Sequence, residues 1–97
     1  MIVWTLQSAQ DLSRLHRFLA SKDLNSAKRA IVAIRSGVKV LLLQPAMGRP
    51  SHDMDAVFRE WIIDFGNSGY VVKYHFNGAD VTILAVRHQF EVGYLPD

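Results

Sequence analysis

The sequence contains no cysteine and no long hydrophobic run, and these two absences exclude several classes of protein. Without cysteine the chain has no disulfide, no thiolate nucleophile and no thiolate metal ligand, which is typical of proteins in a reducing compartment. No apolar stretch approaches the ~18 residues that a membrane-spanning helix needs. The first residues also lack the basic and apolar regions of a signal peptide. We therefore expect a cytoplasmic protein.

Motifs that bind cofactors or metals are missing as well. The sequence has no glycine-rich phosphate loop and no nucleophile elbow. Its four histidines, His16, His52, His75 and His88, are scattered without the paired spacing of zinc ligands. We therefore predict neither a cofactor nor a metal site.

Composition and length indicate one globular domain. Hydrophobic residues make up 49% of the 97 residues and charged residues 21%, a balance that excludes a disordered chain. A chain of this length can bury one modest core. It contains no repeat, linker or low-complexity tract, so we predict a single domain over residues 1–97.

Acidic residues are scarce in the first half of the chain. Residues 1–49 carry eight Lys or Arg against Asp11 and Asp23, whereas residues 50–97 carry three against seven acids. The basic residues can form a solvated helix face. Alternatively, the helical part of the fold contacts something acidic, either nucleic acid or an acidic protein segment.

Residues 2–4 and the stretch after them predict a short strand followed by a helix. Ser8, with an acid three residues later, is typical of a helix N-cap. Helical spacing predicts an inner apolar stripe of Ala9, Leu12, Leu15 and Leu19, with Asp11, Arg14 and Arg17 facing away.

A second, longer helix follows the turn at residues 22–25. Asn25 or Ser26 is its predicted N-cap. Its inner stripe comprises Ala27, Ala30, Ile31, Ile34, Val38, Leu41 and Leu42. The helix must end near Gln44, because Pro45 disfavours helical geometry in the residue before it.

The second half changes to a period of two, which predicts strands over residues 57–65, 70–76 and 81–86. Residues 66–69 and Asn77-Gly78 are the predicted hairpin turns. Residues 88–97 are either a short extra strand or a loose arm. The resulting order, β-α-α-β-β-β, predicts an α+β fold in which a helical hairpin packs on one face of a curved antiparallel sheet and leaves the other face at least partly open.

Several polar side chains fall on or beside these strands. Arg59, Lys73, His75, His88 and Tyr94 together would supply the proton transfers and cations of a metal-free ribonuclease. Lys73 and His75 share a face with Val71. The histidines can equally be ordinary surface residues, and Arg59 must either pair with a carboxylate or lie exposed in a cleft.

The loop over residues 45–50 and the C-terminal tail offer further candidates. Two prolines bracket Gly48, so Arg49 is held in a defined position, where it can cap helix carbonyls or pair with Asp53 or Asp55. The tail carries apolar bulk at Phe90, Val92, Tyr94 and Leu95, which we expect to dock on the domain or on a partner. Trp4 and Trp61 are predicted core residues.

The order and spacing of these motifs resemble the RelE/ParE superfamily of bacterial toxins, and its ParE-like branch most. The motifs are Gly48-Arg49-Pro50, Arg59-Glu60-Trp61, a tyrosine-bearing next strand, and Arg87-His88-Gln89 followed by Gly93-Tyr94. The resemblance covers nearly the whole chain. It implies the toxin of a type II toxin–antitoxin pair, neutralised by an antitoxin whose N-terminal part binds operator DNA, commonly as a ribbon-helix-helix protein.

The two branches of the family imply different targets. ParE-like toxins are associated with poisoning of DNA gyrase without chemistry of their own, whereas RelE-like toxins cut messenger RNA in the ribosomal A site. By resemblance to the nucleases, Arg59 matches the strand arginine, His88 stands where an arginine often does, and Tyr94 matches the C-terminal tyrosine. The nucleases carry a pair of lysines before the strand arginine. This chain lacks the pair: the corresponding stretch, residues 51–58, instead contains Asp53 and Asp55.

Those acids disfavour phosphate binding. The resemblance therefore implies a ParE-like gyrase poison with an obligate antitoxin; the alternatives are a ribosome-dependent endoribonuclease and a member that only binds its antitoxin. The candidate residues for binding the target or the antitoxin are Arg49, Lys73, His75, Arg87, Phe90 and Tyr94.

Overall fold

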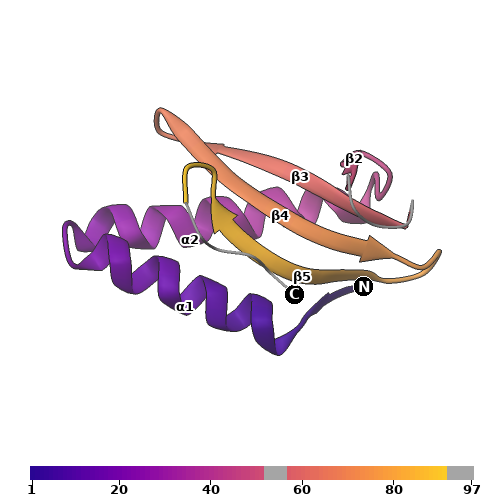
Figure 1. Cartoon of the computed structure of the whole chain (residues 1–97), viewed down its shortest axis with the longest axis horizontal. Helices are drawn as coiled ribbons and strands as arrows, with labels where there is room; N and C mark the ends of the chain where they lie inside the picture. Colours follow the sequence, from indigo (N-terminus) through magenta and orange to yellow (C-terminus); the bar gives the residue numbers. More distant parts are fainter. Residues whose placement is uncertain (52–56, 92–97) are drawn as a thin grey trace.

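The computed structural model describes residues 1–51 and 57–91, and in these ranges two α-helices pack on a five-stranded sheet (Figure 1). The elements in chain order are β1 (Ile2–Trp4), α1 (Leu6–Ala20), α2 (Leu24–Lys39), the 3-10 turn η1 (Val40–Leu42), β2 (Arg49–Pro50), β3 (Phe58–Phe65), β4 (Ser68–Phe76) and β5 (Val81–His88). The predicted α+β architecture is confirmed. Neither described helix is both long and apolar enough to cross a membrane.

The sheet has the strand order β1-β5-β4-β3-β2 and is mixed, whereas the sequence predicted an antiparallel sheet. Short turns force β3, β4 and β5 to run antiparallel to one another. Two helices separate β1 from the rest of the sheet, so no turn constrains it, and it pairs in parallel with β5. Gly66 and Gly78 adopt positive φ in the two turns, a conformation that glycine tolerates best.

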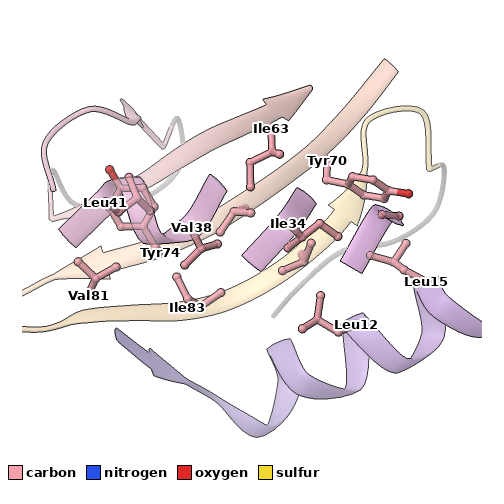
Figure 2. Packing of buried hydrophobic residues seen from close by; sticks show 13 residues of the cluster. Leu12, Leu15, Ile34, Val38, Leu41, Ile63, Tyr70, Tyr74, Val81 and Ile83 are labelled. Atoms are coloured by element: carbon pink, nitrogen blue, oxygen red, sulfur yellow. The ribbon is translucent and has the colours of Figure 1, made fainter. Parts of the chain in front are cut away.

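The hydrophobic core lies between the helices and one face of the sheet (Figure 2). It contains Leu12 and Leu15 of α1, Ala30, Ile34 and Val38 of α2, and Val72, Tyr74, Val81, Ile83 and Val86 of the sheet. Trp4 and Trp61 pack against this cluster, as predicted. The described part of the chain places no helix on the opposite face, so the helices cover one side of the sheet only (Figure 1).

Three predicted helix ends, the two N-caps and the end of the second helix, differ from those in the structure. The N-cap of α1 is Thr5, whose hydroxyl accepts a hydrogen bond from the Ser8 N–H, so Ser8 lies inside the helix. The N-cap of α2 is Asp23, which accepts from the Asn25 N–H. The α-helix itself ends at Lys39, and η1 carries the chain on towards Pro45.

Candidate interaction surface

The sheet face without helices carries three rows of side chains, because paired residues on neighbouring strands point to the same side. The first row joins Phe58, His75 and Thr82; the second joins Arg49, Glu60, Lys73 and Ala85; the third joins Ile62, Val71 and Arg87. We call this set of residues the open face. Val71 and Ala85 are buried within it, whereas Ile62 and Arg49 are exposed.

Charges alternate across the middle row of the open face. An Arg49 guanidinium nitrogen lies 3.2 Å from Glu60 Oε1, and Lys73 stands opposite Glu60 on β4. The sequence offered Asp53 or Asp55 as the partner of Arg49; both lie outside the described residues, and within them the partner is Glu60. Exposed pairs of this kind contribute about 1 kcal/mol or less. The pair therefore orders Arg49 more than it stabilises the fold.

In the part of the chain that the structure describes, two cations of the open face form no ion pair. Across residues 1–51 and 57–91, neither Lys73 nor Arg87 forms an ion pair. Arg87 donates hydrogen bonds to the carbonyls of His88 and Gln89, both at 3.4 Å. The ring of His75 lies tilted against that of Phe58, with 5.2 Å between the ring centroids. The open face thus offers two cations that form no ion pair among the described residues, together with an aromatic pair.

Arg59 belongs to the other side of the sheet. It shares the face of Trp61 and Ile63 and donates hydrogen bonds to the carbonyls of Gly48 and Ala46, at 2.7 and 3.3 Å. Of the two alternatives left by the sequence, a carboxylate partner or an exposed cleft, the described residues provide no carboxylate partner. The guanidinium instead holds the loop between η1 and β2 against the sheet.

Tyr74 holds the same loop from the core, a role that the sequence analysis missed. Its hydroxyl donates to the Pro45 carbonyl at 2.6 Å and accepts from the Gly48 N–H at 2.9 Å. Burial raises the pKa of Tyr74, while the Gly48 hydrogen bond and the Arg59 charge act in the opposite direction. A buried tyrosine hydroxyl needs such hydrogen-bond partners. The loop bracketed by prolines was the feature of the sequence that could have indicated them.

His88 also lies on the helix side, at the far end of the sheet from Arg59. It pairs with the buried Tyr70 across β4 and β5, with ring centroids 5.5 Å apart. Its Nδ1 accepts the Phe90 N–H at 3.1 Å, and its Nε2 lies 2.9 Å from the Ser68 hydroxyl. Because a backbone N–H can only donate, the proton of the neutral ring is on Nε2. Both ring nitrogens are therefore engaged within the chain.

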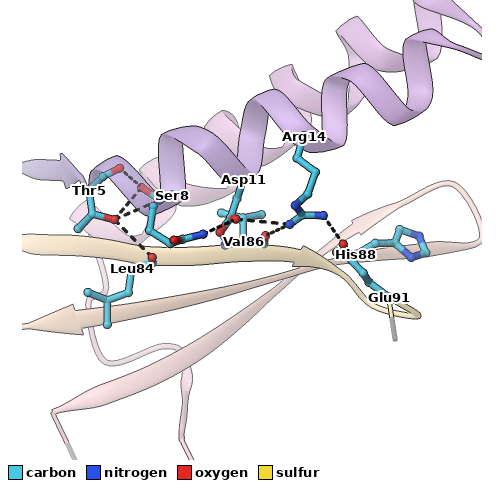
Figure 3. Close-up of polar contacts among 9 residues, drawn as sticks. Thr5, Ser8, Asp11, Arg14, Leu84, Val86, His88 and Glu91 are labelled. Atoms are coloured by element: carbon cyan, nitrogen blue, oxygen red, sulfur yellow. Dashed lines mark hydrogen bonds and ion pairs between the residues drawn. The ribbon is translucent and has the colours of Figure 1, made fainter. Parts of the chain in front are cut away.

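A charged cluster beneath α1 is the second feature that the sequence analysis missed (Figure 3). Asp11 was predicted to face away but is 1% exposed, and it accepts the Val86 N–H at 2.9 Å. Arg14 donates to the Val86 carbonyl at 3.1 Å and pairs with Glu91. The spacing of Asp11 four residues before Leu15 was the signal, since residues four apart share one side of a helix.

The structure thus divides the predicted site residues into two groups. Arg49, Lys73, His75 and Arg87 share the open face, whereas Arg59 and His88 lie on the helix side at opposite ends. Phe90 is 69% exposed beside His88, at 5.8 Å between ring centroids. Tyr94 lies outside the described residues.

Comparisons with known proteins agree with this fold. Residues 2–92 match the sequence model of the ParE toxin of type II toxin–antitoxin systems, parDE. Two curated relatives come from Caulobacter vibrioides. Toxin RelE3 is 34% identical over 86 residues, covering 88% of this chain and 89% of the relative, and Toxin RelE1 is 27% identical over 90 residues, covering 93% and 94%.

A solved structure shares the architecture. It is described as the chromosomal ParDE TA system from P. aeruginosa, and one of its chains superposes with a TM-score of 0.71 at 18% identity, covering 90% of this chain and 92% of that one. At this identity the likeness supports the fold alone. The family match spans almost the whole chain, and the 34% identical relative agrees with it. The chain therefore belongs to the ParE toxin family of type II toxin–antitoxin systems.

Proposed function

We propose that this chain arrests growth in the cytoplasm by binding DNA gyrase, and that an antitoxin encoded beside it neutralises it. Membership of the ParE toxin family supports this proposal. The motifs Gly48-Arg49-Pro50 and Arg87-His88-Gln89, which resemble the gyrase-poisoning branch, support it too.

The observation that carries the proposal is the separation of the groups that RNA cleavage would need. A metal-free ribonuclease requires a base, an acid and a cation around one phosphate. Here Arg59 binds loop carbonyls on the helix side, and His88 uses both ring nitrogens at the other end of the sheet. Lys73 and His75 point to the opposite face. These residues therefore favour a toxin that binds over one that cleaves.

The open face is the surface that we assign to the target. Lys73 and Arg87 provide charges without a carboxylate partner in the described residues, and Phe58 and Ile62 provide apolar contacts. A mixture of aromatic, aliphatic and basic side chains is typical of protein–protein interfaces. Arg49 and His75 extend the same surface towards β2 and β5.

A ribosome-dependent messenger RNA endoribonuclease is the second candidate. The names of the two curated relatives, Toxin RelE3 and Toxin RelE1, favour it. In that case Arg59, His88 and Tyr94 would carry the reaction, and binding to the ribosome would have to free Arg59 and His88 from their present partners.

One set of assays on the purified chain decides between these functions. We expect loss of gyrase supercoiling with accumulation of cleaved DNA, no effect on topoisomerase I as the control enzyme, and no cleavage of messenger RNA on programmed ribosomes. RNA cleavage without an effect on gyrase would overturn the proposal in favour of the second candidate. Activity in neither assay would identify a member that only binds its antitoxin.

A further inference from the structure

The second half of β3 is an uncovered edge of the sheet. β2 lies beside β3 only at Arg59 and Glu60, so residues 61–65 have no outer neighbour among the described strands. We call residues 61–65 the free edge. In Figure 1 no helix or loop lies beyond this part of β3. β1, at the other side of the sheet, is only three residues long and offers a much shorter edge.

The free edge has backbone groups available for a further strand. The Ser51 N–H donates to the Phe58 carbonyl at 3.0 Å, so the backbone groups of Phe58 point away from β4. The direction alternates along a strand, and those of Ile62 and Asp64 therefore point away from β4 as well. No strand in the described part of the chain receives them.

The side chains of the free edge favour pairing. Four of its five residues are apolar, and it contains neither the lysine nor the proline that often protects an edge. Ile62 is 36% exposed on the open face. Trp61 and Phe65 are half-buried on the helix side, where they pack against the core. Such an edge is a template for another strand.

A second copy of this chain supplies a matching strand. Two copies of β3 can pair antiparallel about a two-fold axis, with Ile62 opposite itself, Asp64 opposite itself, or Ile62 opposite Asp64. The first register brings the partner's Asp64 against Glu60, where β2 already lies. The second places two carboxylates directly opposite each other, which is destabilising. Only the third register avoids both conflicts.

The third register also pairs the apolar side chains. It places Trp61 opposite the partner's Phe65, and Ile63 opposite the same residue of the partner, all on the helix side of the sheet. Aromatic and aliphatic pairs across strands stabilise a sheet. The partner strand then ends at its Phe65, next to the point where β2 begins to cover β3. The partner strand and β2 thus occupy successive parts of one edge.

We propose that two copies of this chain pair through their free edges and form one continuous sheet. The two-fold axis of such a pair is perpendicular to the sheet, so both open faces lie on the same side of the dimer. Lys73 and Arg87 of each copy then belong to one extended surface. The inference concerns contacts between copies and does not depend on which target the toxin binds.

A charge swap tests both the pairing and its register. Sedimentation equilibrium measures dimerisation of the wild-type chain, Ile62→Glu and Ile62→Glu/Asp64→Lys. We expect a wild-type dimer in the micromolar range, since a short edge makes a small interface. Ile62→Glu puts an acid opposite the partner's Asp64 and should weaken the dimer about tenfold. The double variant replaces this repulsion by an opposite-charge pair and should restore most of the affinity.

Leu6→Glu is the matched control, because Leu6 is 76% exposed at the start of α1, away from the free edge. It should dimerise like the wild type. Circular dichroism and thermal unfolding verify that every variant is folded. A wild-type chain that stays monomeric at millimolar concentration would overturn the inference. So would equal dimerisation of Ile62→Glu and Leu6→Glu, or a double variant that is no tighter than Ile62→Glu.

Hydrogen exchange locates the interface independently of the variants. The amides of Ile62 and Asp64 should exchange rapidly in dilute solution and become protected as the concentration of the chain rises, because pairing engages them in hydrogen bonds. Protection elsewhere without protection of these two amides would place the dimer on another surface and contradict the inference. Protection that arises only when the antitoxin is added would show that the antitoxin, not a second copy, occupies the edge.

Discussion

The Asp11 carboxylate accepts a hydrogen bond from the Val86 N–H at 2.9 Å, although the two residues are 75 positions apart in the sequence. Strand β1 pairs with β5 only as far as Ile83, so within residues 1–51 and 57–91 no strand lies beside the same edge of β5 at Val86. Asp11 and Arg14 of α1 bind the N–H and the carbonyl of Val86 instead (Figure 3). Helix side chains thereby replace a neighbouring strand and close an edge that would otherwise recruit one.

Replacement of Asp11 by alanine should therefore destabilise the protein strongly. The change leaves the buried Val86 N–H without its acceptor and removes the ion pair between Asp11 and Arg14. We expect a loss of about 3 kcal/mol in the free energy of unfolding, measured by urea denaturation. Asp64→Ala, at an exposed acid of β3, is the control and should change stability by less than about 0.5 kcal/mol.

Replacement of Tyr74 by phenylalanine should destabilise the protein by about 1–3 kcal/mol, because the half-buried Pro45 carbonyl and the buried Gly48 N–H each lose a partner. Tyr70→Phe is the control, since the Tyr70 hydroxyl makes no hydrogen bond within the described residues. Urea denaturation of both variants measures the difference. Equal costs at the two positions would show that the loop does not depend on Tyr74.

Stability should fall at alkaline pH. Burial raises the pKa of Tyr70 and of Tyr74 above the ordinary value of 10.0. Above that pH the unfolded chain loses tyrosine protons first, so the native state binds more protons and the free energy of unfolding decreases as pH rises towards the folded pKa. Below pH 10.0 this stabilisation is fully present. Denaturation between about pH 9 and about pH 12 measures the slope, which should flatten in the Tyr70→Phe/Tyr74→Phe variant.

Gly37→Ala should destabilise the protein, although alanine is favoured over glycine inside a helix by about 1 kcal/mol. An added Cβ would lie 2.7 Å from both Cδ1 and Cγ1 of Ile63, and the Gly37 carbonyl accepts the Trp61 Nε1–H at 3.1 Å. Overpacking of this kind costs about 1–3 kcal/mol. In an Ile63→Ala background the same substitution should become stabilising, and a double-mutant cycle measures this coupling. An unchanged sign would contradict the close packing of α2 on β3.

A comparison of the Lys73→Ala and His88→Ala variants tests which face of the sheet carries the toxic activity. If the open face binds gyrase, Lys73→Ala should weaken gyrase inhibition by about tenfold, while His88→Ala should leave most of it. A nuclease would respond in the opposite way, since His88 would take part in proton transfer. The measurement is the concentration of each variant that half-inhibits supercoiling, with Arg29→Ala on the helical hairpin as the control. It decides between gyrase binding by the open face and a nuclease that uses His88.

Local patterns in the sequence were sufficient for the two helices and for the described strands other than β2, which lies where a loop was predicted. The change from helical spacing in residues 27–42 to alternation after Val57 predicted two helices followed by strands, and the structure confirms both. The glycines at 66 and 78 marked the turns because they adopt a backbone conformation that few other residues accept. Helix ends were less predictable, since Thr5, Ser8 and Asp23 all fit the chemistry of an N-cap.

The candidate site was only partly predictable. Alternation along β4 correctly placed Lys73 and His75 together, because the period of a strand is fixed by its geometry. The relation of Arg59 and His88 to that pair depends on the pairing of β3, β4 and β5. It also depends on the register shift between Lys73 and Tyr74, which no local pattern predicts.

The sequence by itself determined the two helices, four of the five described strands, most of the apolar core and the basic character of the helical layer, because these properties depend on neighbours a few residues apart. Only the tertiary structure decided that β1 runs parallel to β5, that Asp11 is buried against Val86, and that Arg59 turns to the loop at Gly48. Each of these depends on contacts between segments distant in the chain. Their energies are set by which backbone groups the folded sheet leaves without a partner.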